Sequence, residues 1–107
     1  MLDDYLSWVN SRKNSVTNKV KESLKILLEN NPNVSKVWLS GSYVKGDWID
    51  ENTETKYKEY RYKVTGKNKI SDIDFITDPP VESTNHYDII SLNNHRLLIY
   101  DNSKTKI

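Results

Sequence analysis

The sequence predicts an α+β domain in which N-terminal helices pack on a small mixed or antiparallel β-sheet. Three observations indicate this class. Apolar residues recur at helical spacing through residues 2–28, apolar residues alternate as in a strand through residues 34–40, and Gly, Pro and Asn divide the rest into short segments. The chain has 107 residues, which suits one domain with a modest core. We therefore expect a single domain over residues 1–107.

Two helical segments are expected near the N-terminus. Residues 2–9 place apolar side chains at the i, i+3, i+4 and i+7 positions of an amphipathic helix, and residues 16–28 do so more strongly. Residues 11–15 form either a bend in one helix or the break between two. Pro32 ends the second segment, because it disfavours helical geometry at Asn31.

The first strand and a final hairpin enclose the rest of the chain. Within residues 34–40, Val37 and Leu39 face one side and Trp38 faces the other. Residues 87–91 and 96–100 form a last apolar pair, which the turn residues Asn93 and Asn94 join. The sheet is therefore built from strands that lie on both sides of a charged central region.

That central region, about residues 50–68, is interpreted as an inserted β-ribbon. Residues 57–64 form its first strand, Gly66-Lys67-Asn68 the turn, and residues 69–77 the second strand, which ends at Asp78-Pro79-Pro80 because proline cannot donate to a ladder. Its interleaved lysines and tyrosines could stack bases and contact phosphates. We favour the simpler interpretation, in which the tyrosines pack on the sheet and the lysines keep an edge strand soluble. Nucleic acid is therefore not the favoured partner.

Composition excludes several classes of function. The chain has no cysteine, so disulfides, thiolate metal sites and cysteine nucleophiles are excluded. The net charge of +1 does not favour a protein that binds polyanions by bulk electrostatics. No apolar run is long enough to span a membrane, and the N-terminal residues lack the pattern of a signal peptide. We expect a cytoplasmic protein, or one in the host cytoplasm if a phage encodes it, with no membrane partner.

A Gly-Ser pair follows the first strand and opens a short helix over residues 43–49. Glycine at Gly41 lets the backbone approach an anion closely, the first N–H groups of a helix are unpaired, and the Ser42 hydroxyl adds a donor. Lys45 could lean over phosphates, and Gly46 would keep the next turn free of a side chain near the ligand. The alternative is that Gly41-Ser42 only terminates the strand.

The segment SDIDF carries two carboxylates with one residue between them. On a strand, Asp72 and Asp74 project to the same face, while Ile73 and Phe75 point into the core. Neighbouring carboxylates repel unless a cation lies between them, and Mg²⁺ takes few protein carboxylates and leaves room for substrate phosphates. The alternative is a solvated strand face.

Together, Gly41-Ser42-Tyr43-Val44-Lys45-Gly46 and Ser71-Asp72-Ile73-Asp74 resemble a known motif pair. They are similar, position by position, to the GSxxxG…SDID signature of minimal members of the nucleotidyltransferase superfamily, which includes DNA polymerase β. The similarity covers roughly residues 34–90. It implies a nucleotidyltransferase fold and transfer of a nucleoside monophosphate from an NTP, with ATP as the first guess, to an acceptor hydroxyl with release of pyrophosphate.

The resemblance also implies roles for individual residues. The third carboxylate of the family is matched by Asp88 in HYDIIS, with Asp78 and Asp101 as competitors, and it would lie nearest the attacking hydroxyl. The catalytic residues, which would also hold two Mg²⁺ ions, are then Asp72, Asp74 and Asp88. The nucleotide-binding residues are Gly41, Ser42, Lys45, Gly46 and Ser71.

The sequence departs from the family pattern on the acceptor side. The inserted region about 50–68 is longer than minimal members need, the connection from Asp74 to Asp88 is short, and no helices follow Tyr100. Such a domain could bind its acceptor on a partner protein, act on a small molecule, or dimerise. The alternative function is a catalytically inactive module that acts as a structural or interaction protein, such as a phage component. His86 and His95 are interpreted as surface residues.

Overall fold

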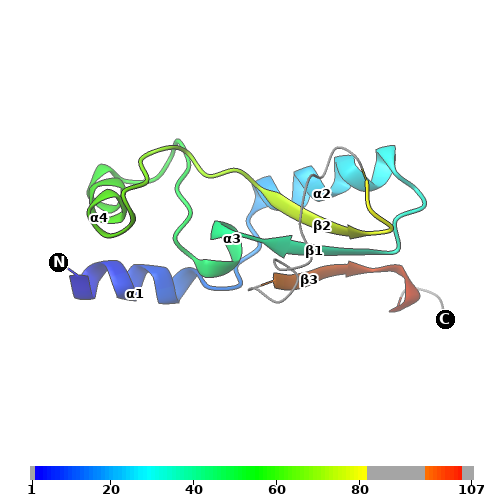
Figure 1. The fold of residues 1–107 in the computed structure, drawn as a ribbon, viewed down its shortest axis with the longest axis horizontal. Coiled ribbons are helices and arrows are strands. Elements are labelled where there is room, and N and C mark those ends of the chain that lie inside the picture. The colour runs from blue at the N-terminus through cyan, green and yellow to red at the C-terminus, as the bar shows by residue number, and fades with distance from the viewer. Residues whose placement is uncertain (1, 82–95, 105–107) are drawn as a thin grey trace.

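The computed structural model describes residues 2–81 and 96–104, and within these it is an α+β structure (Figure 1). Its elements in chain order are α1 (Leu2–Arg12), α2 (Asn18–Asn30), β1 (Lys36–Ser40), α3 (Ser42–Lys45), α4 (Thr55–Thr65), β2 (Asp74–Asp78), β3 (Arg96–Asp101) and a 3₁₀ turn at Asn102–Lys104. No helix in this described part of the chain is long and apolar enough to cross a membrane.

The two predicted N-terminal helical segments are confirmed, and they form two separate helices and not one bent helix. Asn14 has a positive φ of 62°, which breaks the helical path between them. Thr17 caps the start of α2, because its side-chain oxygen accepts a hydrogen bond from the Val20 N–H at 3.3 Å. The helix ends at Asn30, just before Asn31-Pro32, as the sequence predicts.

The described sheet has three antiparallel strands in the order β2-β1-β3, with β1 at its centre. Val37 and Leu39 are fully buried and Trp38 is partly exposed, which confirms the alternation predicted for this strand. Figure 1 shows α2 running along one face of the sheet. Val20 and Leu27 of this helix belong to the core clusters that include β1. The core thus fixes the direction of β1, and the site lies at its C-terminal end.

The prediction of an inserted β-ribbon is wrong, because residues 55–65 form the helix α4. Tyr57, Tyr60 and Arg61 lie at i, i+3 and i+4, so one helical face carries them inward, while Tyr62 is 55% exposed. Gly66 ends the helix in the left-handed conformation, and its N–H donates to the Tyr62 carbonyl at 2.8 Å. Lysine, glutamate and arginine are also good helix formers, which favours this outcome.

The strand β2 is shorter than predicted, because it begins at Asp74 and not at residue 69. Residues 66–73 instead form an irregular connection from α4 to the sheet. The final strand is confirmed at Arg96–Asp101. The predicted strand 87–91, the turn at 93–94 and both histidines lie outside the described residues.

Aromatic stacking attaches α4 to α1 at one end of the molecule (Figure 1). The rings of Trp8 and Tyr57 are parallel within 3°, and their centroids are 5.0 Å apart. The Arg12 guanidinium lies over the rings of Trp8 and Trp48, at 4.1 and 3.4 Å. Burial lowers the pKa of Arg12 to about 10, which leaves it charged at neutral pH. This packing sets where α4 lies relative to β1.

Candidate functional site

A cavity of about 500 Å³ lies where the end of β1, the start of β2 and the segment after α4 meet. Sites for small ligands and cofactors usually have about 300–1,000 Å³, so a nucleotide is of suitable size. Most of the predicted site residues line it: Gly41, Ser42, Lys45, Ser71, Asp72 and Asp74. Gly46 is not part of this lining, and Asp88 lies outside the described residues.

The Gly-Ser turn lies directly against the second motif. Ser40 pairs with Asp74 across the β1–β2 ladder, which places the Asp74 carboxylate beside Gly41. Gly41 has φ 74° and ψ −147°, a conformation that side chains rarely adopt. A Cβ on Gly41 would lie 2.6 Å from Asp74 Oδ2. Glycine at this position is therefore what allows the carboxylate to lie against the turn.

Asp72 and Asp74 both face the cavity, as the alternation argument predicts, although only Asp74 is part of a strand. Ile73 and Phe75 pack against the core on the other side. Burial raises the pKa of Asp74, and the negative charge of Asp72 raises it further. A cation between the two carboxylates would relieve both effects. Their all-oxygen character fits Mg²⁺.

In the described ranges, the structure contains no cluster of three or more acidic or histidine side chains that could hold a metal ion. Two carboxylates are sufficient protein ligands for Mg²⁺, which normally retains waters and substrate oxygens. The third predicted ligand, Asp88, belongs to the residues that the structure does not describe. The metal site therefore remains a prediction that rests on Asp72 and Asp74.

The helix that follows the Gly-Ser turn is the single turn α3, which agrees with the one or two turns predicted but ends at Lys45 and not at residue 49. Its dipole is small, because few peptide units are aligned. The Lys45 side chain is exposed and can reach a ligand in the cavity. Positive charge for an anion must therefore come from side chains around the cavity, with Ser42 as a neutral donor.

Gly46 has a different role from the predicted one. It has φ 92°, and a Cβ built on it would collide with the main-chain carbonyl of Val9 in α1. The missing side chain thus lets the end of α3 lie against α1. It does not make room for a ligand in the cavity.

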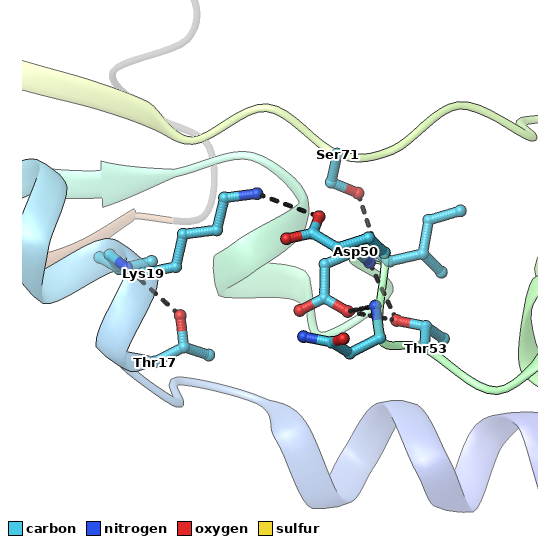
Figure 2. Close-up of polar contacts among 9 residues, drawn as sticks. Thr17, Lys19, Asp50, Thr53 and Ser71 are labelled. Atoms are coloured by element: carbon cyan, nitrogen blue, oxygen red, sulfur yellow. Dashed lines mark hydrogen bonds and ion pairs between the residues drawn. The ribbon is translucent and has the colours of Figure 1, made fainter.

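Ser71 is buried and already engaged in hydrogen bonds (Figure 2). Its hydroxyl oxygen accepts from the Ile49 N–H at 3.0 Å, and its own N–H donates to the Ile49 carbonyl at 2.9 Å. These two bonds tie the connection before β2 to the segment after α3. The hydroxyl hydrogen can still be donated into the cavity, so the predicted contact with phosphate is compatible with this structural role.

Sequence reasoning missed Arg61, which α4 brings to the cavity. Only 3% of this residue is exposed. The signal that could have found it is the spacing of Tyr57, Tyr60 and Arg61. In a helix, and not in a β-ribbon, this spacing places the three residues on one face. Lys67 and Lys69, in the segment after α4, also line the cavity.

The cavity wall therefore carries charges of both signs. The cations are Lys45, Arg61, Lys67 and Lys69, and the anions are Asp47, Asp72 and Asp74. A metal ion bound by carboxylates next to a polyphosphate held by cations requires this combination. Oδ1 of Asp47 is buried and has no hydrogen-bond partner among the described residues.

Comparison of the chain with protein-family models, curated proteins and solved structures finds no match in any of the three.

Proposed function

We propose that this protein is a Mg²⁺-dependent nucleotidyltransferase, which moves a nucleoside monophosphate from an NTP to an acceptor hydroxyl and releases pyrophosphate. The observation that carries the proposal is the close approach of Gly41 to Asp74 at the edge of a cavity that Ser42 and Asp72 also line. Two motifs that are far apart in the sequence are thereby brought to one place. The resemblance of both motifs to those of the nucleotidyltransferase superfamily supports the same reaction.

The carboxylates are assigned to the metal side of the site. Asp72 and Asp74 would hold Mg²⁺, and Asp88 is proposed as the third carboxylate. When bound, the metal neutralises charge on the triphosphate and lowers the pKa of the attacking hydroxyl. The two described carboxylates would orient the reacting phosphate, because both line the cavity and the pairing of β2 with β1 fixes the position of Asp74.

The Gly-Ser turn and the cavity lysines are assigned to the phosphate side. Gly41 would allow a phosphate to approach the backbone closely, and Ser42 would donate a hydrogen bond to a phosphate oxygen. The Lys45 side chain is exposed and would adjust to the position of the phosphates. We take ATP as the first candidate among the NTPs. The acceptor is a hydroxyl of a partner protein or of a small molecule, and a second copy of the chain could complete the acceptor side. We propose the cytoplasm, or a host cytoplasm, as the place of action.

The experiment is transfer of label from α-labelled ATP, CTP, GTP and UTP with Mg²⁺, with and without cell lysate as a source of acceptors. The test variants are Asp72→Asn and Asp74→Asn, which should lose transfer by at least about a hundredfold, because each removes a carboxylate on the metal. Asp78→Asn is the matched control, since Asp78 lies on the same strand and is exposed, but pairs with Lys36 at the opposite end of β1 and is outside the cavity lining.

Transfer that survives in both variants at the wild-type rate would refute the assignment. Metal-dependent nucleotide binding without any transfer would favour the alternative, a non-catalytic interaction module that keeps the site. Loss of transfer in Asp78→Asn together with the other two variants would show that the effect comes from the strand and not from the site.

A further inference from the structure

We propose that Arg61 is a phosphate-binding residue of this cavity, which α4 supplies from outside both motifs. The inference rests on the proposed nucleotide function and deepens it, because it assigns the fixed positive charge that would hold the polyphosphate. Neither the GSxxxG nor the SDID segment contains this residue. The argument depends on its burial, its weak hydrogen bonds and its place in the cavity wall.

Burial is the first step. Arg61 is 3% exposed, and burial of a charged side chain is costly unless an opposite charge pairs with it. In the described part of the chain, no carboxylate forms an ion pair with Arg61. Although Asp47, Asp72 and Asp74 line the same cavity, none of these described carboxylates lies close enough to Arg61 to form an ion pair with it.

The hydrogen bonds of Arg61 compensate this burial only weakly. One terminal nitrogen donates to the carbonyl oxygens of Lys67 and Lys69, at 3.4 and 3.2 Å, and the other donates to the Ser71 hydroxyl oxygen at 3.4 Å. These acceptors are neutral, and the distances lie at or beyond the usual range of about 2.7–3.2 Å. The buried Nε has no partner among the described residues.

The chemistry of the guanidinium group identifies the missing partner. Its five N–H donors form a planar fork that matches the oxygens of a phosphate, and such charge-assisted bonds are stronger than those to carbonyl oxygens. Lys45, Lys67 and Lys69 line the same cavity but are exposed, so they can adapt to many anions. Arg61 is held in place by its burial, and so it would select the position of one phosphate.

The test compares ligands that carry the phosphates with ligands that carry the base. Mg²⁺-ATP, tripolyphosphate and adenosine are titrated against the wild type, Arg61→Met, Arg61→Lys and Lys58→Met. Lys58 is the matched control, because it lies on the same helix and loses the same charge, but is outside the cavity lining. Thermal unfolding without ligand is measured for each variant.

We expect Arg61→Met to weaken ATP and tripolyphosphate by about tenfold or more, as for loss of a charge-assisted hydrogen bond, and to leave adenosine within about twofold. Arg61→Lys should be intermediate, and Lys58→Met should match the wild type. Without ligand, Arg61→Met should melt no lower than the wild type, because it removes a buried charge whose hydrogen bonds are long and go to neutral acceptors. If this variant does not fold, the contrast between ATP and adenosine in Arg61→Lys decides the question.

Unchanged ATP affinity in Arg61→Met would overturn the inference, and so would an equal loss for all three ligands together with a lower melting temperature. Wild-type protein that binds neither ATP nor tripolyphosphate would overturn both this inference and the proposed function. Arg61-dependent ATP binding without label transfer would refute the transferase alone and leave the role of Arg61 intact.

Discussion

Substitution of Gly41 by alanine tests the geometry on which the candidate site depends. The conformation at Gly41, φ 74° and ψ −147°, is close to a region that essentially only glycine occupies, so a side chain there costs about 1–3 kcal/mol. The added Cβ would also lie 2.6 Å from Asp74 Oδ2, which is too close, and the carboxylate would have to move. Because that atom ends a movable side chain, we expect a total loss of roughly 3 kcal/mol from the free energy of unfolding.

Gly66→Ala is the matched control for backbone strain. Gly66 has nearly the same φ, 75°, but its ψ of 3° is the ordinary left-handed conformation, and a Cβ there would meet nothing within 4 Å. Although Gly66 also borders the cavity, we expect this variant to lose only about 1 kcal/mol. The difference between the two variants then measures the contact with Asp74 together with the more restricted ψ.

Urea unfolding and Mg²⁺-dependent ATP binding are the two assays for this pair. A loss of about 3 kcal/mol corresponds to a decrease in Tm on the order of 10 °C for a domain of this size. Because Gly41→Ala displaces a proposed metal ligand, its ATP affinity should fall by about tenfold or more, while Gly66→Ala should lose much less. If both variants unfold at the same urea concentration and bind ATP equally well, the close approach of Gly41 to Asp74 does not build the site.

Two further predictions follow from the same wall of the cavity. Burial and the charge of Asp72 raise the folded-state pKa of Asp74 above its ordinary 3.8, so the folded chain binds this proton more readily than the unfolded chain and charged Asp74 destabilises the fold. In metal-free buffer, Asp74→Asn should therefore be more stable than the wild type at neutral pH. Urea unfolding at a series of pH values should show that this gain disappears as the pH falls through the folded-state pKa towards 3.8. A gain in stability that is constant with pH would contradict this reasoning. Ser71→Ala should lower the free energy of unfolding by about 1–3 kcal/mol in urea, because the Ile49 N–H is left without its acceptor, and an unchanged value would show that water replaces the hydroxyl.

The elements that the sequence predicts correctly are those with strong local signals. The apolar face of α2 follows the helical period through Val20 and Leu27, Pro32 follows its end, and β1 alternates about Trp38. Such patterns can be read without tertiary information, because the core selects them directly. The placement of Asp72 and Asp74 beside the Gly-Ser turn is likewise available from two short motifs.

The helix α4 could not be predicted in the same way, because its inward face lacks aliphatic residues. Arg61 is the one buried residue of α4. The contact of this helix with α1 is the stacking of Tyr57 on Trp8. Tyr60 and Tyr62 among lysines fit a strand as well as a helix, so the local pattern does not decide between them. The position of Arg61 at the cavity depends on tertiary packing, which no motif encodes.

The helix α1 contacts both walls of the cavity, although no residue of α1 lines it. On one side, the Val9 carbonyl lies against Gly46, at the end of the turn that carries Ser42. On the other side, Trp8 stacks on Tyr57, in the helix that carries Arg61. The helix α1 therefore packs against both walls. A shift of α1 along its axis would change the distance between the two walls, although α1 itself would not contact a bound ligand.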